Sequence, residues 1–302
     1  MCIRDSPNHF QSNFLLGTLS AQTKKFDIAK QLLNKATEID PDFMDAHNNL
    51  GNVQRELGEN HKAIISYEKA IQINPNYAQA HNNLGTALQK LEEYQKAKSC
   101  YEQAIQINPN YVDAHNNLGN VLKKLGEYQK ARTSYQKAID MQPDYANVHN
   151  NLGNVLKELG EYQEAKNCFE KAIRIQPDFA LAYNNLGAVQ QALEEYQEAA
   201  ISYQEAINIL PNFAEAHSNL GAVLQKLGKR EKAISCYQEA IKIQPTNADT
   251  HYNLGIAFKE LGEHQKAIFY NEKAINLKPD YVRAYSNMLL TCLLYTSDAA
   301  DE

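Results

Sequence analysis

Eight prolines recur every 34 residues along this 302-residue chain, and they set the period of everything else in it: Pro41, Pro75, Pro109, Pro143, Pro177, Pro211, Pro245 and Pro279. Eight glycines keep the same step: Gly17, Gly51, Gly85, Gly119, Gly153, Gly187, Gly221 and Gly255. Self-similarity at a fixed period of 20 to 50 residues is typical of arrays in which one small structural unit is stacked on copies of itself.

Each repeat has the pattern of two helices. We number a repeat so that the recurring glycine is position 8, which gives the ranges 10–43, 44–77, 78–111, 112–145, 146–179, 180–213, 214–247 and 248–281. In the fourth repeat, Ala114, Leu118, Val121 and Leu125 are spaced by four, three and four residues, which is one face of a helix. Ala131, Tyr135, Ala138 and Ile139 continue the pattern in its second half. A Gly-Glu pair near positions 15 and 16 ends the first helix, and the proline at position 32 ends the second.

The small residues indicate how the two helices meet. Glycine at position 8 and alanine at positions 20 and 27 allow two helix backbones to approach closely, and tyrosine or phenylalanine at position 24 fills the space between them. Asn271 replaces that aromatic residue in the eighth repeat, so we expect looser packing there. One hairpin cannot bury its apolar face alone, so the hairpins must stack in line. The predicted fold is an all-α solenoid.

The pattern A-H-N-N-L-G-N-V-L-K-K-L-G-E-Y-Q-K-A-x3-Y-x2-A-I-x3-P, read from Ala114 to Pro143, resembles the tetratricopeptide repeat. The resemblance extends over most of the chain, from Phe10 to Met288. It implies a right-handed superhelix of eight repeats plus part of a ninth, over 282–291, with a concave groove lined by the first helices. The chain departs from the family at position 4, where the family often has tryptophan and this chain has histidine in six repeats: His47, His81, His115, His149, His217 and His251.

The two ends do not follow the period. We expect residues 1–9 to be a non-native or disordered leader and residues 292–302 to be a non-native tail, because M-C-I-R-D-S and L-L-Y-T-S-D-A-A-D-E resemble translated sequencing-adapter tails. The alternative is a pair of genuine, frayed termini.

Composition excludes several classes of function. The formal net charge is -6, with lysine and glutamate mixed throughout, which argues against binding to nucleic acid or to an anionic membrane surface. No apolar run approaches the roughly 20 residues of a membrane span. The five cysteines form no CxxC pair, and no signal peptide is recognisable, so the sequence favours a reduced, cytoplasmic protein.

Asparagine is the polar residue that recurs most regularly in the first helix. Position 6 is asparagine in every repeat but the first, and position 5 is asparagine in five repeats: Asn49, Asn83, Asn117, Asn151, Asn185, Asn219, Asn253 and Asn287 at position 6, and Asn48, Asn82, Asn116, Asn150 and Asn184 at position 5. Asparagine is a poor helix former, so its recurrence inside a helix needs a reason. Stacked repeats would align these amides in ladders.

Two interpretations of the ladder remain open. A primary amide both donates and accepts hydrogen bonds, as a peptide backbone does. With helices roughly 8–10 Å apart and about 3.3 Å per extended residue, each position-6 asparagine would meet about every third residue of a bound strand. The thirteen asparagines are therefore our candidate peptide-binding residues. The alternative is a structural role, in which position-6 asparagine caps or bridges neighbouring repeats.

Three functions follow from these patterns. The first is a protein–protein interaction scaffold that binds an extended peptide or a partner helix in the concave groove. The second is the substrate-recognition arm of a protein glycosyltransferase, because the asparagine ladder and the segment Tyr285-Ser-Asn-Met-Leu-Leu-Thr resemble the repeat arm of O-GlcNAc transferases and Spindly-type enzymes. That resemblance implies that the position-6 asparagines contact the substrate backbone. The third is a structural array that acts through self-association.

No residue pattern predicts chemistry within the chain itself. The position-4 histidines lie one repeat apart, roughly 10 Å, whereas a zinc ion needs ligand nitrogens within about 2.1 Å. We therefore expect no metal, no cofactor and no catalytic residue, and predict that these histidines pack on the glycine side of the first helix. Cys100, Cys168 and Cys236 recur at position 23 two repeats apart, too far for a disulfide.

Overall fold

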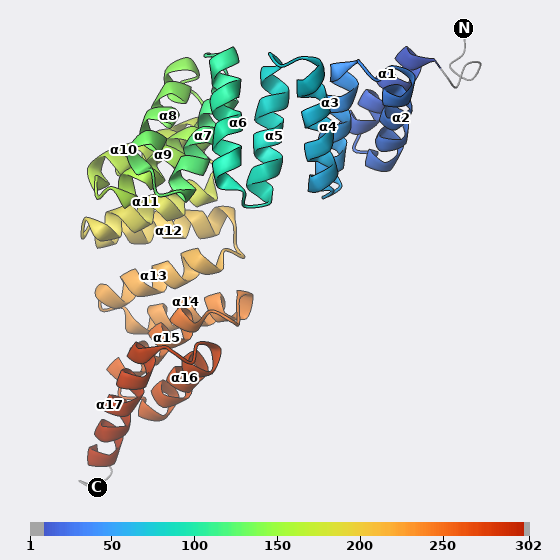
Figure 1. Ribbon diagram of the computed structural model, residues 1–302. Helices are drawn as coiled ribbons and strands as arrows, with labels where there is room; N and C mark the ends of the chain where they lie inside the picture. The colour runs from blue at the N-terminus through green and yellow to red at the C-terminus, as the bar shows by residue number, and fades with distance from the viewer. Residues whose placement is uncertain (1–8, 299–302) are drawn as a thin grey trace. The chain divides into compact units, whose positions relative to one another are not determined.

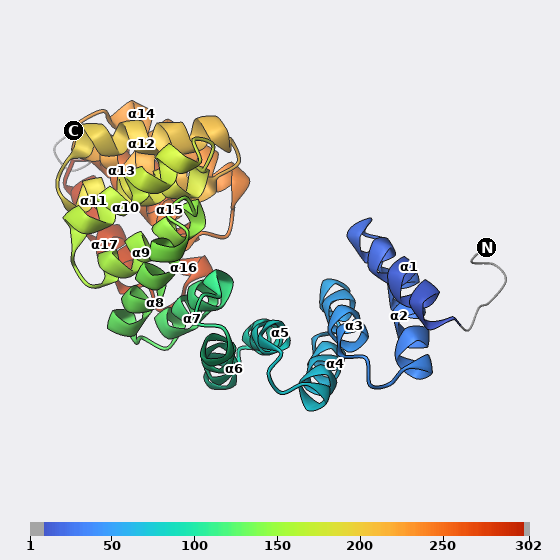
Figure 2. The same ribbon diagram turned by 90° about the horizontal axis from the view of Figure 1, so that it is seen from above.

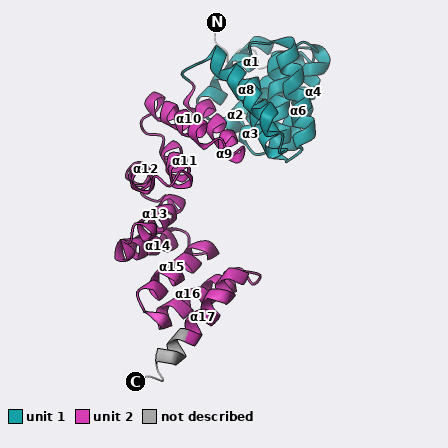
Figure 3. Ribbon diagram, turned by 90° about the vertical axis from the view of Figure 1, so that its left-hand side faces the viewer, with its two compact units in different colours: residues 1–144 teal, residues 145–302 magenta. Residues whose placement is uncertain are grey.

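The computed structural model describes residues 9–298, and their regular structure is entirely helical (Figure 1). The chain divides into two compact units, Met1–Asp144 and Tyr145–Glu302, which Figure 3 colours separately. The helices of unit 1 are α1 Phe10–Gln22, α2 Phe26–Ile39, α3 Met44–Glu56, α4 Asn60–Ile73, α5 Ala78–Lys90, α6 Tyr94–Ile107, α7 Val112–Lys124 and α8 Tyr128–Met141. Those of unit 2 are α9 Ala146–Glu158, α10 Tyr162–Ile175, α11 Ala180–Ala192, α12 Tyr196–Ile209, α13 Ala214–Lys226, α14 Arg230–Ile243, α15 Ala248–Glu260, α16 His264–Leu277 and α17 Val282–Asp298.

Each repeat forms an antiparallel hairpin, as α3 and α4 show in Figures 1 and 2. The first helix ends one residue before position 14, which is leucine in every repeat but the first, and position 15 then reverses the chain with a positive φ. Glycine occupies position 15 in five repeats, at φ between 73° and 78°. Lys24, Glu92 and Glu194 adopt the same conformation in the other three, with φ of 59°, 61° and 62°. The predicted all-α solenoid of helical hairpins is confirmed.

The core of each hairpin is the contact between position 8 and position 24. Tyr67, Tyr101, Tyr135 and Phe169 are completely buried, and each lies against the glycine of its own repeat. The tyrosine hydroxyls reach polar side chains of the first helix: Tyr135 donates to Asn120 Oδ1 over 2.7 Å. The two helices of a hairpin therefore approach closely, as the small residues predicted, and the glycine of the first helix packs directly against the aromatic ring of the second.

The eighth hairpin has an asparagine, Asn271, in place of the aromatic residue at position 24. Asn271, at position 24, is fully buried, and its Nδ2 donates to the carbonyl oxygen of Ala267 over 2.7 Å. Its Oδ1 accepts a hydrogen bond from Asn287 Nδ2 of α17 over 3.2 Å. The looser packing expected here is therefore not seen at Asn271 itself, because hydrogen bonds satisfy its buried amide.

Within each unit, the first helices of neighbouring repeats contact one another: α1 with α3, α3 with α5 and α5 with α7 in unit 1, and α9 with α11, α11 with α13 and α13 with α15 in unit 2. Among the described helices, no comparable contact joins the second helices of neighbouring repeats. The first helices thus lie on the tighter side of the stack. We call the surface formed by them the first-helix face of each unit.

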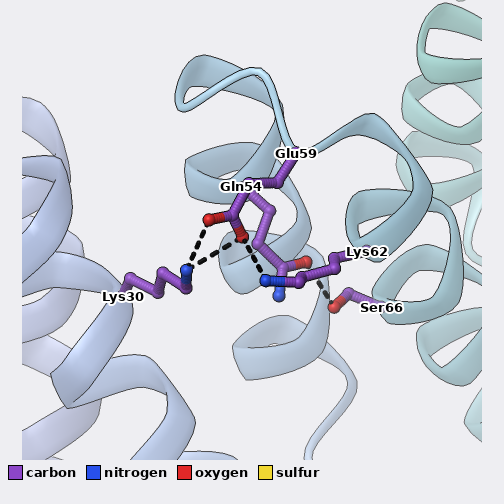
Figure 4. Close-up of polar contacts among 5 residues, drawn as sticks. All are labelled: Lys30, Gln54, Glu59, Lys62 and Ser66. Carbon is purple, nitrogen blue, oxygen red and sulfur yellow. Dashed lines mark hydrogen bonds and ion pairs between the residues drawn. The ribbon is translucent and has the colours of Figure 1, made fainter.

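Charged pairs join some neighbouring repeats from the second helices. Lys30 of α2 places its Nζ 2.6 Å from Glu59 Oε1, at the turn of the next repeat, and Lys62 lies 3.2 Å from the other oxygen of that carboxylate (Figure 4). Lys98 with Glu127 and Lys166 with Glu195 repeat the arrangement at 2.9 Å and 2.6 Å. Hydrogen bonds from Lys30 and Lys62 lower the pKa of Glu59, and those from Lys130 and Lys98 lower the pKa of Glu127.

The two ends of the array differ from the repeats between them. Residues 1–8 of the expected leader lie outside the described residues, and His9 caps α1 by accepting from the backbone N–H of Ser12. At the other end, α17 begins at the start of the expected ninth repeat and runs on to Asp298, into the segment that we expected to be a tail. Residues 299–302 of that segment lie outside the description. Leu289 takes the glycine position in α17 and is 65% exposed.

Candidate peptide-binding face

The asparagines at positions 5 and 6 meet across the boundary between repeats, on the first-helix face. In each of four pairs, Nδ2 of the position-6 residue donates to Oδ1 of the position-5 residue in the preceding repeat. The pairs are Asn83 to Asn48 at 3.0 Å, Asn117 to Asn82 at 3.0 Å, Asn185 to Asn150 at 2.9 Å and Asn219 to Asn184 at 3.1 Å. The bridging role that we left open at the sequence level is therefore observed in these pairs.

The two positions differ in exposure. Every position-5 asparagine is buried; Asn48 and Asn184 are each 1% exposed. At position 6, Asn83 and Asn185 are also buried, whereas the other five are half-buried: Asn49, Asn117, Asn151, Asn219 and Asn253. The bridge uses one of the two N–H groups of a position-6 amide, which has a second N–H and an oxygen acceptor besides.

Two position-6 asparagines at the ends of the array have other partners. Asn49 donates to the hydroxyl of Thr18 over 3.2 Å, because Phe14 stands at position 5 of the first repeat. Asn287 accepts from Lys259 Nζ and donates to Asn271, and it is only 8% exposed. Its polar atoms therefore hold α17 against α15 and α16.

Hollows separate neighbouring first helices beside these amides. One, of about 320 Å³, lies between α1 and α3 and is lined by Thr18, Ala21, Asn49, Asn52 and Val53, among others. Another, of about 310 Å³, lies between α5 and α7 and is lined by Thr86, Gln89, Lys90, Asn117 and Lys124 with the turn residue Glu92 and Tyr94. Both lie on the first-helix face and contain a half-buried position-6 asparagine; the lining of the first is mainly apolar and that of the second is mixed.

The position-4 histidines make one recurring contact, across the corner between repeats. Nε2 lies 2.9 Å from the carbonyl oxygen of the proline six residues earlier in five repeats: His47, His81, His115, His217 and His251. A carbonyl oxygen only accepts, so Nε2 carries the proton. Burial lowers the pKa of His115, although the bond to Pro109 opposes this effect. We expected these rings to pack on the glycine side of the first helix. In the structure they also form a hydrogen bond between the first helix and the turn that precedes it.

The remaining reactive groups are placed for packing. Burial raises the pKa of the Cys100 thiol to about 11, so at neutral pH this group is protonated and a poor nucleophile. Among the described residues, no three His, Cys, Asp or Glu side chains are grouped so that they could hold a metal ion. None of the described helices has the length and apolar character needed to cross a lipid bilayer.

Sequence reasoning missed one surface feature. A hollow of about 710 Å³ lies on the opposite, second-helix side of unit 2, where α12, α13 and α14 meet, and its lining includes Ile201, Leu220, Leu224, Lys232 and Cys236. Ile201 is 64% exposed there, and Ile65 is 66% exposed at the same position of the second repeat. An isoleucine at position 22, where other repeats mostly have polar residues, was the available signal.

The geometry agrees with the comparison to family models. Residues 110–302 match the model described as the cilia and flagella-associated protein 70 C-terminal domain, itself a tetratricopeptide-repeat model. Tetratricopeptide-repeat models also match 10–43, 32–65, 51–92 and 78–111. The chain belongs to the tetratricopeptide-repeat family. No curated protein matches it by sequence.

Solved structures of the same repeat architecture resemble this tetratricopeptide-repeat protein. The anaphase-promoting-complex hetero-tetramer Cut9–Hcn1 matches with a TM-score of 0.68 and 18% identity, over 88% of this chain and 52% of that chain, so this protein spans about half its length. YrrB, described as a tetratricopeptide-repeat protein with an unusual peptide-binding site, matches with a TM-score of 0.52 and 29% identity, over 62% of this chain and 96% of its own. MamA matches with a TM-score of 0.50 and 28% identity, over 53% and 94%.

Proposed function

We propose that this chain is a protein-interaction scaffold whose first-helix face binds an extended segment of a partner protein. The observation that carries the proposal is the placement of the half-buried Asn49 and Asn117 in the linings of hollows between successive first helices. The tetratricopeptide-repeat family and the likeness to YrrB, with its peptide-binding site, support it.

The bridges between repeats strengthen this reading rather than replace it. A buried position-5 asparagine, such as Asn82, accepts a hydrogen bond from one N–H of the position-6 asparagine in the next repeat, here Asn117. This bond fixes the orientation of the Asn117 amide plane. The second N–H and the oxygen of Asn117 are then oriented before a ligand arrives, which reduces the entropy lost on binding. In this proposal the position-6 asparagines contact the ligand backbone, and the position-5 asparagines orient them.

The experiment starts by selecting 12-residue peptides from a display library against the whole chain. Affinities of the selected peptide are then measured for the parent, Asn117→Ala and Asn82→Ala. Both substitutions remove the same bridge, but only the first removes the amide that faces the hollow. We expect Asn117→Ala to weaken binding about fivefold, the equivalent of one ordinary hydrogen bond, and Asn82→Ala to weaken it less.

A second measurement checks the mode of binding. Methylating single backbone nitrogens of the selected peptide removes one donor at a time, and we expect the affinity loss to recur about every third residue, the spacing of the helices. Equal effects of Asn117→Ala and Asn82→Ala, or peptides insensitive to both, would contradict the proposal. Thermal melting by circular dichroism controls for unfolding of either variant.

The glycosyltransferase-arm alternative makes the same use of this face and differs only in what the partner is. It rests on the resemblance of the asparagine ladder and of Tyr285-Ser-Asn-Met-Leu-Leu-Thr to such arms, and no observation on the described residues favours it over a scaffold.

A further inference from the structure

The first-helix face of unit 1 has basic side chains that the protein itself does not neutralise. Lys90 ends α5 and Lys124 ends α7, both at position 13, both exposed, and neither forms an ion pair or a hydrogen bond with the described residues. By contrast, Lys30 and Lys98 on the second helices are each within 3 Å of a glutamate of the next repeat.

Both unpaired lysines line the same hollow, between α5 and α7. Asn117 lies in its wall together with Thr86 and Gln89, so two ammonium groups flank uncharged hydrogen-bonding groups. Glu92 is the single acidic residue in the lining and stands at the turn, at the edge of the two helices. The second lysine comes one repeat after the first, which corresponds to about three residues of an extended strand.

In unit 2, lysine at position 13 does not recur in successive repeats. Lys226 of the seventh repeat is exposed like Lys90 and Lys124, but the repeats on either side have Ala192 and Glu260 at this position. Lys157 is followed by Glu158, and Gln191 by Ala192, at positions 12 and 13 of the fifth and sixth repeats. In the eighth repeat Lys259 donates to Asn287, and Glu260 lies 3.7 Å from Arg230. Lysine at position 13 of two successive repeats is therefore a property of unit 1.

Resting on the function proposed above, we propose that the first-helix face of unit 1 selects an extended acidic segment, with carboxylates about three residues apart that contact Lys90 and Lys124. Discrete carboxylates fit better than a continuous polyanion such as RNA. Acidic side chains also lie on the first helices of unit 1: Glu56, which pairs with Arg55 at 3.4 Å, Asp45 and Asp113. A polynucleotide has a phosphate at every residue, so some of its phosphates would lie near these carboxylates and be repelled by them.

The test uses fluorescein-labelled 12-residue peptides and the full chain, followed by fluorescence anisotropy. One peptide has Asp at every third position with Ser and Ala elsewhere, a second has Asn in place of Asp, and a third has the same four Asp placed together. We expect the spaced Asp peptide to bind at least tenfold more tightly than the Asn peptide and more tightly than the clustered one. Its affinity should fall as salt is raised, because the contacts are exposed to solvent.

The variant Lys90→Glu with Lys124→Glu should lose at least tenfold in affinity for the spaced Asp peptide. The matched control is Lys35→Glu with Lys137→Glu, which makes the same change in net charge at exposed positions of α2 and α8. Equal losses in the two double variants, or equal binding of the Asp and Asn peptides, would overturn the inference. Tighter binding of a labelled 12-nucleotide single strand that depends on Lys90 and Lys124 would overturn it in favour of a nucleic acid.

Failure of this inference is separable from failure of the proposed function. If selected peptides still distinguish Asn117→Ala from Asn82→Ala while the spaced Asp peptide does not bind, the face binds peptides but does not select acidic ones. If neither behaviour is seen, both proposals are wrong.

Discussion

A Cβ atom on Gly119 would lie 2.5 Å from Cε1 of Tyr135, so no side chain fits between α7 and α8 at this point. The Tyr135 ring is completely buried, and its hydroxyl donates a hydrogen bond to Asn120. Both contacts restrict movement of the ring away from an added methyl group. The same contact recurs between Gly51 and Tyr67 and between Gly153 and Phe169.

Gly119→Ala is therefore expected to destabilise the protein by about 1–3 kcal/mol, as overpacking does, even though alanine favours a helix over glycine by about 1 kcal/mol. The measurement is urea unfolding of the parent, Gly119→Ala, Tyr135→Ala and the double variant. In the Tyr135→Ala background the ring is gone, so Gly119→Ala should be neutral or stabilising. An additive double variant would mean that the ring is not what excludes the methyl group.

Glu194→Gly is expected to stabilise the protein by about 1 kcal/mol. Glu194 has a φ of 62°, a conformation that costs a residue with a Cβ about 1–2 kcal/mol and that glycine adopts readily. Part of this gain is offset because glycine is more flexible in the unfolded chain. Glu194→Ala is the control, since it removes the carboxylate but keeps the strained backbone. Similar thermal midpoints for the two variants would show that charge, not φ, explains the effect.

The buried glutamine and serine at positions 11 and 23 should be energetically coupled in the repeats that have both, although the fourth repeat combines Leu122 with Ser134. Ser66 donates to Gln54 Oε1 over 2.8 Å (Figure 4), and Ser202 donates to Gln190 over 2.6 Å, whereas Leu88 accompanies Cys100 at these positions of the third repeat. Gln54→Leu alone leaves the Ser66 hydroxyl without its acceptor and should cost about 1–3 kcal/mol. Adding Ser66→Cys recreates the third-repeat pair.

The double variant Gln54→Leu with Ser66→Cys should recover most of that loss, and Ser66→Cys alone should be destabilising because Gln54 then loses its donor. The four unfolding free energies form a cycle whose coupling energy is the quantity of interest. A double variant less stable than both single variants would contradict the coupling.

Acidification should destabilise the corners between repeats before it affects the ion pairs. Burial holds the pKa of His115 below its usual 6.5, so the unfolded chain binds this proton more readily, and stability falls as the pH drops through about 6.5. The pKa of Glu59, Glu127 and Glu239 is lowered from 4.5, so their contribution is present above that pH and is lost only below it.

His115→Gln provides the check, because an amide N–H can still donate toward the Pro109 carbonyl but does not titrate. We expect the drop in unfolding free energy between pH 7.5 and pH 5.5 to be smaller in this variant than in the parent. A drop of the same size in both would assign the pH dependence to other groups.

The helices and their core could be predicted from sequence because the signals are local. Gly119, Tyr135 and Pro143 each act within their own repeat, and the helical periodicity between them needs no knowledge of neighbouring repeats. The hydrogen bonding of the buried Asn271 could not be predicted, since its partner Asn287 belongs to the next helix along the array.

The candidate site was predicted only in part, for a related reason. Position-5 and position-6 asparagines are adjacent in sequence, yet in four pairs the partner lies 35 positions away, as Asn82 does from Asn117. That pairing depends on how one repeat is offset against the next, which no single helix encodes. The position-4 histidine contact with the proline carbonyl also depends on the path of the corner, although the two residues are only six apart.

The amide bridge has a consequence for how the length of such an array changes. Each of the middle repeats has an acceptor asparagine for the repeat that follows and a donor asparagine for the repeat that precedes, so loss or duplication of any one of these blocks within a unit rejoins a donor to an acceptor. The seventh repeat ends this interchangeability, because Ser218 stands at position 5 and accepts from Thr250 Oγ1 over 3.2 Å. We therefore expect gene variants with different numbers of repeats to have gained or lost whole repeats that precede the seventh, which contains Ser218.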